Sequence, residues 1–317
     1  FSAPVTAQLA LGIRLKPVSG GAAILPRVDD DAQGETTVDE VRFAPTLTEN
    51  AAYTLELPQG LVDASGRAPA NVSLFPLKVG TGPMPPLVKF AAAPFGALER
   101  LAEPGGTALL PLTVRNVEPA LQALGLAVGE SQVRDLKLLS DADIIAWYQR
   151  VEAFHERDVE RRLAVQWART PLPKVIDKDN PDWVEGRMLG LLHGLPQAKA
   201  LTLPSPAAGD PRPMEVIGVP LQPGFHVVEI ASPRLGRSLL DERHGSTRTQ
   251  YVRTSTLVTN LGVHVKLGRE NALAWVTTLD KGKPVASATV QVSDCRGKVV
   301  ARGQTDAQGI ARLDGLP

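Results

Sequence analysis

The first residues that could do chemistry are His155 and Glu156, at the start of the sequence HERDV. A zinc-dependent protease carries two histidines one helical turn apart, with a glutamate after the first as general base. Here the second histidine position, residue 159, is valine. The pattern lacks a metal ligand, so we expect His155 to lie at the surface or edge of a helix.

Serine and histidine residues could together carry out acyl transfer. Ser232 and Ser238 both lack the Gly-x-Ser-x-Gly turn that exposes a nucleophilic serine. His226 and His264 alternate with β-branched residues, so each is expected on a strand face as an amphipathic spacer. Neither has a serine or carboxylate nearby in a recognisable catalytic order. We expect no hydrolase triad and no catalytic residue in this chain.

Two short segments could hold an ion or a phosphate. DDDAQGE at 29–35 is rich in the oxygen ligands of calcium, but it lacks the twelve-residue ligand pattern and its closing glutamate. A solvated hairpin tip is therefore favoured. The Gly-x-Gly of VGTGPMPP at 79–86 leads into prolines rather than into the helix N-terminus that would hold a phosphate. The sequence thus indicates no metal and no cofactor.

Cys295 is the single cysteine of the 317-residue chain. It rules out an internal disulfide framework and any thiolate-rich metal site built from this chain alone. It lies in SDCRGK, at an expected hairpin turn. Arg296 beside it could activate the thiol, but no general base follows in the sequence. An inert or partly exposed thiol is favoured over a nucleophile.

The charge balance excludes some partners. Lys plus Arg (34) equals Asp plus Glu (34), so no long-range field would attract nucleic acid or an anionic membrane. The basic residues at 156–162 are interleaved with acids, which favours a solvated helix face over a phosphate site.

No apolar run approaches the roughly 20 residues needed to cross a bilayer, so a membrane is expected only through an anchor outside this chain. The opening FSAPVTAQ has neither an initiator methionine nor a basic start; we expect a piece of a longer polypeptide whose sorting signal lies elsewhere.

The elements that must carry these residues are mostly strands. Residues 1–80 contain short alternating runs punctuated by Pro, Gly and Asp, which predict a small antiparallel sandwich. In YTLEL, Tyr53, Leu55 and Leu57 share one face, and the following DASGR supplies a hairpin turn. Three prolines and two glycines in GTGPMPP at 80–86 predict a stiff connector and a domain boundary.

A second β domain is predicted over 87–257, with a helical and loop insertion at about 120–212. Within 140–167 the apolar residues recur at spacings of three and four, which predicts one amphipathic helix carrying Ile144, Tyr148, Val151, Phe154, Val159 and Leu163 on its buried face. Ser140 followed by Asp143 resembles a capping arrangement at its start.

Five further alternating runs predict a third sandwich over 258–317. These 60 residues are fewer than the ~100 of a typical sandwich, so its last strands are expected beyond Pro317. The predicted fold class is mainly β: tandem antiparallel β-sandwich domains of Ig-like or macroglobulin-like type with one helical insertion.

Three motifs in the third unit, LVTNLGVHVK, WVTTLDKGKPVASATV and GQTDAQG, resemble the junction between two macroglobulin-like domains in bacterial alpha-2-macroglobulins. LQPGFHVVEI resembles the strand that precedes this junction, and the first unit is similar to the Ig-like domain near the N-terminal side of the same proteins. The likeness covers nearly all of the chain and is weakest at 120–212.

The resemblance implies a protease trap. In that family a protease cuts an exposed bait segment, the molecule rearranges, and a Cys-Gln thioester in some members captures the attacker. The thioester pattern is Cys-x-Glu-Gln, whereas Cys295 is followed by Arg296, Gly297 and Lys298, so this chain carries no thioester and Cys295 does not take that role. KVIDKDNPDW at 174–183 is loop-like and could be cut.

We therefore expect a non-catalytic scaffold fragment of a broad-spectrum protease inhibitor. Its expected partners are proteases, through the full-length parent, and a peptidoglycan-synthesis protein is a further candidate. The expected location is the periplasm or cell envelope, with a lipid anchor through the missing N-terminus as one route. The alternative is an Ig-like surface adhesin or spacer; an accessory module of a polysaccharide-active enzyme ranks last because aromatics are only 4%. The candidate contact residues for a partner are aromatic: Trp147, Tyr148, Trp167 and Trp183.

Overall fold

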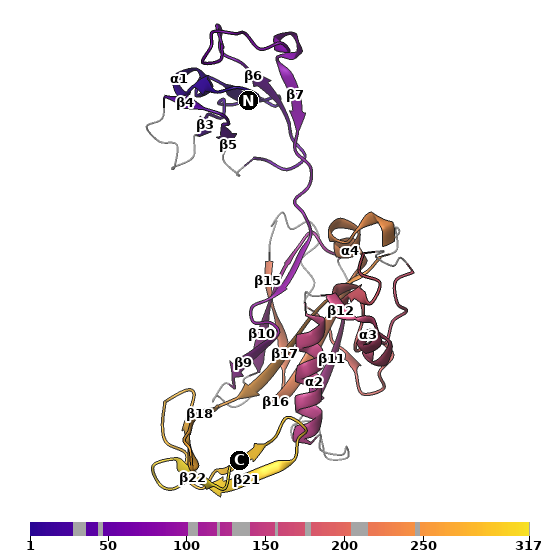
Figure 1. The fold of residues 1–317 in the computed structure, drawn as a ribbon, viewed down its shortest axis with the longest axis vertical. Helices are drawn as coiled ribbons and strands as arrows, with labels where there is room; N and C mark the ends of the chain where they lie inside the picture. The colour runs from indigo at the N-terminus through magenta and orange to yellow at the C-terminus, as the bar shows by residue number, and fades with distance from the viewer. Residues whose placement is uncertain are drawn as a thin grey trace. The chain divides into compact units, whose positions relative to one another are not determined.

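A computed structural model describes most of the chain. The described residues are 1–27, 36–43, 47–100, 107–118, 121–128, 140–155, 158–174, 179–203, 215–244 and 248–316. They form two compact units, Phe1–Met84 and Pro85–Pro317 (Figure 1). The division falls within the Gly- and Pro-rich connector at 80–86. The calcium-like segment at 29–35 lies outside the described residues.

The first unit is built from short strands and one helical turn. Its elements are β1 (Val5–Thr6), α1 (Ala7–Ala10), β2 (Arg14–Pro17), β3 (Pro26–Arg27), β4 (Thr37–Val38), β5 (Arg42–Phe43), β6 (Ala52–Glu56), η2 (Val72–Leu74) and β7 (Leu77–Gly80). The described strands pair as a β2-β6-β7 sheet and as the two-stranded pairs β1-β4 and β3-β5. All of these pairs are antiparallel.

The residue pattern explains the packing of this unit. Tyr53 is buried on β6, as the alternation predicts, and its hydroxyl accepts a hydrogen bond of 3.0 Å from the Thr48 N–H. The Asp63 carboxylate accepts hydrogen bonds from the backbone N–H groups of Ser65 and Arg67, which closes the DASGR turn. This turn does not join β6 to a neighbouring strand directly; it lies within the long connection to β7.

The second unit begins with a two-layer sandwich. One sheet has the order β15-β10-β8 and the other β14-β11-β16-β17-β9. The strands are β8 (Leu87–Phe90), β9 (Phe95–Glu99), β10 (Ala108–Arg115), β11 (Gln122–Val128), β14 (Lys199–Ala200), β15 (Glu215–Leu221), β16 (Gly224–Ser232) and β17 (Gln250–Thr259). The core between the layers includes Phe90, Leu112, Val219 and Ile230. Both sheets are antiparallel except where β9 runs parallel to β17.

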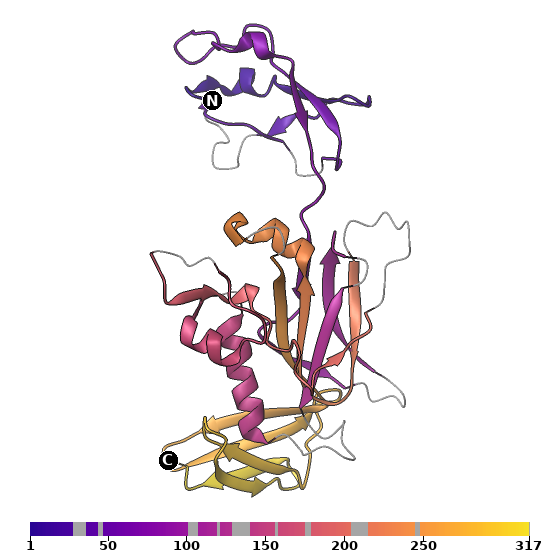
Figure 2. The ribbon, with the colours of Figure 1, turned by 90° about the vertical axis from the view of Figure 1, so that its right-hand side faces the viewer.

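The helical insertion covers the outer face of the five-stranded sheet (Figure 2). Its elements are α2 (Asp141–Phe154), β12 (Asp158–Glu160), α3 (Arg161–Trp167), β13 (Trp183–Glu185) and η4 (Gly186–Met188). Val151 of α2 packs on Phe225 and Val227 of β16. Two more helices, α4 (Pro233–Leu239) and η5 (Glu242–His244), follow β16.

The single long helix predicted over 140–167 is wrong. α2 ends at Phe154, and His155 has an extended backbone with ψ 114°. Val159 is buried on β12, where it pairs with Val184 of β13, and Leu163 belongs to the separate α3. Pairing and burial of two β-branched residues override the helical periodicity at this point.

The start of α2 agrees with the sequence. The Asp143 carboxylate accepts hydrogen bonds from the Ser140 N–H (3.0 Å) and from the Ser140 hydroxyl (3.1 Å). Such a side chain satisfies donors that precede the first helical turn, which fixes where the helix begins.

Five strands make up the C-terminal part of the second unit, one for each predicted run. β18 (Leu261–Leu267), β19 (Asn271–Thr278) and β22 (Ile310–Asp314) form one sheet, and β20 (Thr289–Ser293) and β21 (Val299–Gln304) form a hairpin. Ala272, Ala274, Ala311 and Leu313 form their own core against this hairpin. The predicted fold class, tandem antiparallel β-sandwich domains, is confirmed, whereas the predicted domain limits remain predictions.

The β20–β21 hairpin contacts the start of α2. The Asp141 carboxylate accepts hydrogen bonds of 2.6 Å from Gln291 Nε2 and 2.6 Å from the Ser293 hydroxyl. Gly297 in the hairpin turn lies so close to Ala142 that an added Cβ would stand 2.4 Å from its Cα. None of the described helices is both long and apolar enough to cross a membrane.

Candidate functional site

His155, the first candidate ligand, lies just past the end of α2, where its N–H bonds to the Glu152 carbonyl at 3.4 Å. Glu156 lies outside the described residues. Within the described ranges, no three His, Cys, Asp or Glu side chains come together in a way that could hold a metal ion. Among the residues that the structure describes, His155 therefore has no partner for metal chemistry.

Ser232 has a structural environment. Its hydroxyl donates a hydrogen bond of 2.7 Å to Glu118 Oε2 and accepts one of 3.0 Å from the Leu235 N–H. It thereby begins α4, whose first residue is Pro233. Ser238 is exposed on α4. A capping serine whose hydroxyl is engaged on both sides is not poised to attack a substrate.

The two strand histidines differ in burial. His226 on β16 is 4% exposed, and its Nε2 lies 2.7 Å from the Gln222 carbonyl oxygen. Burial lowers the pKa of His226, and the hydrogen bond to Gln222 opposes this; the residue is not the amphipathic spacer expected. His264 on β18 is exposed and lies against the Trp275 ring, with 5.7 Å between ring centroids.

Cys295 is exposed in the β20–β21 turn. Its turn is closed by Asp294, whose carboxylate accepts from the backbone N–H groups of Arg296 and Lys298. These contacts explain the hairpin expected at SDCRGK.

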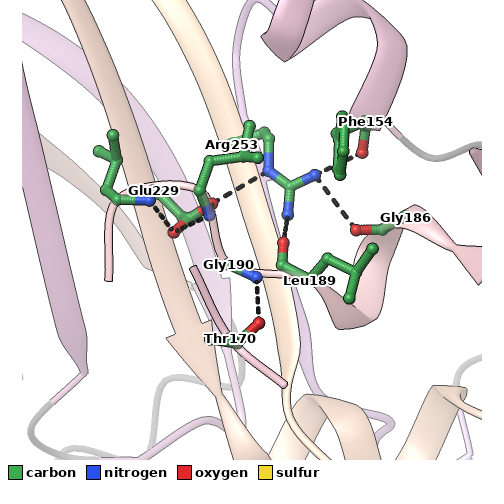
Figure 3. Close-up of polar contacts among 9 residues, drawn as sticks. Phe154, Thr170, Gly186, Leu189, Gly190, Glu229 and Arg253 are labelled. Carbon is green, nitrogen blue, oxygen red and sulfur yellow. Dashed lines mark hydrogen bonds and ion pairs between the residues drawn. The ribbon is translucent and has the colours of Figure 1, made fainter. Parts of the chain in front are cut away.

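A buried polar cluster between the five-stranded sheet and the insertion is made of residues that the sequence analysis did not single out (Figure 3). Glu229 on β16 and Arg253 on β17 are 3% and 2% exposed and stand opposite each other in the antiparallel register. Arg253 Nε donates to Glu229 Oε2 at 3.2 Å. Both side chains point to the face of the sheet that the insertion covers.

Arg253 is surrounded by backbone acceptors of the insertion. Its Nη1 donates to the carbonyl oxygens of Phe154 and Gly186, and its Nη2 donates to that of Leu189 (Figure 3). Burial lowers the pKa of Arg253, while the charge and hydrogen bond of Glu229 raise it. The guanidinium thus joins the end of α2, η4 and the segment after η4.

Glu229 binds the same segment from the other side. Its two oxygens accept hydrogen bonds of 2.9–3.1 Å from the Leu191 and Leu192 N–H groups. With Arg253 as well, three N–H groups donate to this carboxylate, and the Leu191 N–H is shared between its two oxygens. These contacts tie the segment after η4 to β16, so the cluster anchors the insertion.

The sequence contained a signal for this cluster. FHVVEI and YVRTSTL are strands buried along most of their length, and each carries one charged residue. A charged residue in a buried strand needs a partner of opposite charge. The missing information was which strands are neighbours.

A cavity of about 430 Å³ adjoins the anchor on the same face of the sheet. Its polar lining comes from Gln122, His193, Glu229 and Tyr251, and the rest is mostly leucine and alanine. Burial and then the charge of Glu229 raise the pKa of Tyr251. The carboxylate that lines the cavity, that of Glu229, already accepts from three N–H groups.

The predicted aromatic contact residues divide into two pairs. Tyr148 and Trp183 are 41% and 46% exposed. Trp147 and Trp167 pack partly buried against the apolar cores beneath the insertion. Tyr148 also meets Phe95 edge to face, with 5.7 Å between ring centroids.

The architecture so far is a modular β protein with an anchored helical insertion, a class whose members serve many functions. Residues 258–317 match the family model of the bacterial alpha-2-macroglobulin MG3 domain. The match covers 60 of the 317 residues, and it confirms the resemblance to bacterial alpha-2-macroglobulins drawn from the motifs in that segment.

Solved structures with some likeness include two crystal structures of native alpha-2-macroglobulin from Escherichia coli. The first, spanning domains NIE-MG1, is 15% identical, covers 73% of this chain and 88% of that chain, and has a TM-score of 0.39. The second, spanning domains MG0-NIE-MG1, is 14% identical, covers 100% and 84%, and has a TM-score of 0.41. Chicken CNTN1 FN1-FN3 domains are 10% identical, with coverage of 99% and 79% and a TM-score of 0.18. TM-scores this low do not define the fold of this chain. No curated protein shows significant sequence similarity to it.

Proposed function

We propose that this chain is a non-catalytic scaffold of a bacterial alpha-2-macroglobulin-like, broad-spectrum protease inhibitor. The observation that carries the proposal is the match of residues 258–317 to the MG3 domain of that family. The proposed partners are proteases, engaged through the full-length protein, and the proposed location is the periplasm or cell envelope. A peptidoglycan-synthesis protein is a further proposed partner.

The physical chemistry of the described residues supports a scaffold. Ser232 caps a helix, Glu229 accepts from three N–H groups that tie it to Arg253 and the insertion, and Cys295 is exposed in a turn without the Cys-x-Glu-Gln sequence of a thioester. The buried ion pair of Glu229 and Arg253 holds a helical insertion on a β-sheet. Such an arrangement positions surfaces and does not transform a substrate.

The test uses the full-length polypeptide that contains this chain. It is run on gel filtration before and after a sub-stoichiometric amount of a broad-specificity protease, with the same protease inactivated by a covalent inhibitor as control. Its mass is measured before and after methylamine, which adds to a thioester. The residual activity of the protease is assayed on a large protein and on a small peptide substrate.

The outcomes separate the alternatives. Compaction after cleavage, together with loss of activity on the large substrate only, supports the trap, and a methylamine adduct adds a thioester elsewhere in the polypeptide. If cleavage changes neither the elution volume nor the protease activity, a protease-inhibitor function of the full-length polypeptide is excluded. An Ig-like adhesin or spacer then becomes the better explanation.

A further inference from the structure

The Arg150 guanidinium of α2 lies against two tryptophan rings. Its guanidinium carbon lies 4.9 Å from the ring centroid of Trp147 and 5.5 Å from that of Trp167. Trp147 precedes Arg150 by three residues on the same face of α2, and Trp167 is the last residue of α3. A side chain from each of the two helices therefore helps to hold the guanidinium in place.

The charge of a second guanidinium, that of Arg169, acts on Arg150. Burial lowers the pKa of Arg150, the positive charge of Arg169 lowers it further, and the more weakly acting Asp143 opposes both. Arg169 follows Trp167 by two residues and is exposed. The Asp143 carboxylate is engaged by Ser140 at the start of the helix.

Neither arginine side chain forms an ion pair or a hydrogen bond with an acidic group in the described part of the chain. The Arg150 Nε atom is buried and has no hydrogen-bond partner. This contrasts with Arg253, which satisfies its donors on Glu229 and three carbonyls. Two cations that no acidic side chain of the described residues pairs directly cost free energy in the unliganded protein, and an oxyanion would offset that cost.

The stacking also selects the chemistry of a ligand. A guanidinium is a planar fork that binds carboxylate or phosphate oxygens in pairs. Beside the rings of Trp147 and Trp167, no acceptor among the described residues binds the N–H donors of Arg150. Because the side chain is already ordered, binding would cost little additional rotamer entropy.

We propose that Arg150 and Arg169 form a binding site for an oxyanion, the carboxylate or phosphate group of a small ligand, on the surface of the helical insertion. Arg150 supplies the fixed fork and Arg169 the second charge. The site does not depend on protease inhibition, so it stands or falls separately from that function.

The test reads the tryptophans that flank Arg150. Trp183 and Trp275, which are 46% and 45% exposed, are replaced by phenylalanine, so that Trp147 and Trp167 are the remaining indoles of the four in the chain. This protein is titrated with inorganic phosphate and, separately, with succinate, while sodium chloride holds the ionic strength constant. A saturable change in fluorescence with either anion is the expected result. The anion that binds shows whether the site takes a carboxylate or a phosphate group.

Variants establish which residues bind. Arg150→Met should weaken binding at least tenfold while keeping an unbranched side chain beside the indoles, and Arg150→Lys should also weaken it because the fork is lost. Arg169→Ala should weaken binding severalfold. Arg312→Met, which removes an exposed arginine paired with Asp314, should leave binding unchanged.

Two results would overturn the proposal. One is the lack of a saturable response to both anions; the other is a response that Arg150→Lys and Arg169→Ala leave unchanged. Should Arg150→Met lose its native circular dichroism, Arg150→Lys and Arg169→Ala still decide, because both retain the packing around Trp147 and Trp167.

Discussion

Glu229 and Arg253 face each other across β16 and β17, with 3.2 Å between Glu229 Oε2 and Arg253 Nε. Removing two charges from water is expensive, and their attraction repays this only when the remaining donors and acceptors are satisfied. Here the further partners are backbone groups of the insertion. The pair therefore acts as a positional lock between a sheet and a segment more than 35 residues away in the chain.

The first prediction concerns this lock. Arg253→Met leaves the Glu229 carboxylate buried without its counter-charge and removes the donor to three carbonyls, so we expect a loss of about 3–5 kcal/mol in the free energy of unfolding. The measurement is urea unfolding of the chain followed by circular dichroism.

A matched control is Arg312→Met. Arg312 pairs with Asp314, but both side chains are about two-thirds exposed (65% and 68%), so this variant should change stability by less than about 1 kcal/mol. Equal effects from the two substitutions would show that the buried pair does not lock the insertion.

The second prediction follows from the buried His226. Its pKa is below the ordinary value of 6.5 in the folded protein, so the unfolded chain binds the proton more readily. The stability that this residue contributes is full above pH 6.5 and is lost as the pH falls below that value. We expect the wild type to lose more stability between pH 7.5 and pH 5 than His226→Gln does.

The check is urea unfolding of both proteins at the two pH values. Because all other titrating groups are shared, the difference between the two proteins isolates the imidazole. His264→Gln, at an exposed position of β18, serves as the control for replacing a histidine by glutamine. A His226→Gln variant with the same pH dependence as the wild type would contradict the assignment.

Some of this fold could be predicted because its signals are local. Alternation marked the strands around Tyr53 and His226, and the spacing from Ser140 to Asp143 marked the start of α2. Asp294 and Gly297 identified the β20–β21 turn. Each of these features is decided by residues within about five positions of one another.

The features that were missed depend on distant contacts. Val159 leaves the helical pattern because Val184, 25 positions later, pairs with it. Glu229 and Arg253 meet only because β16 and β17 are neighbours, and Arg150 meets two indoles only because α3 packs on α2. Local propensity contains no information about such neighbours.

The third prediction tests the contact between α2 and the β20–β21 hairpin. Hydrogen bonds from Ser293 and Gln291 hold the pKa of Asp141 below its usual value of 3.8. The stabilisation by Asp141 is therefore present above that pH and is lost as the pH falls through the lower, folded-state value. At pH 7, Asp141→Ala should speed amide hydrogen exchange in residues 289–304 by about fivefold, equivalent to about 1 kcal/mol.

A double-mutant cycle with Ser293→Ala distinguishes this contact from a change in the helix itself. Ser293→Ala leaves α2 untouched, so the two substitutions should be less than additive if they remove the same hydrogen bond. Full additivity would mean that Asp141 acts on the helix terminus alone.

The fourth prediction compares two glycines of the C-terminal domain that share a left-handed backbone. Gly309 has a φ of +76° and Gly282 a φ of +62°, so alanine at either position should cost about 1–2 kcal/mol from backbone strain alone. Their surroundings differ. A Cβ at Gly309 would stand 2.5 Å from the Val276 carbonyl oxygen, whereas a Cβ at Gly282 would meet nothing within 4 Å.

Gly309→Ala must therefore also move backbone, because the Val276 N–H is itself bonded to the Gly309 carbonyl at 2.8 Å. We expect Gly309→Ala to lower the free energy of unfolding by at least about 1 kcal/mol more than Gly282→Ala, since loss of one buried hydrogen bond adds to the strain. Chemical denaturation of the two variants, with hydrogen exchange at Val276 as a local probe, gives the comparison. Equal losses, with unchanged exchange at Val276, would mean that the β21–β22 turn accommodates a side chain at 309 and that the close approach to β19 does not restrict this position.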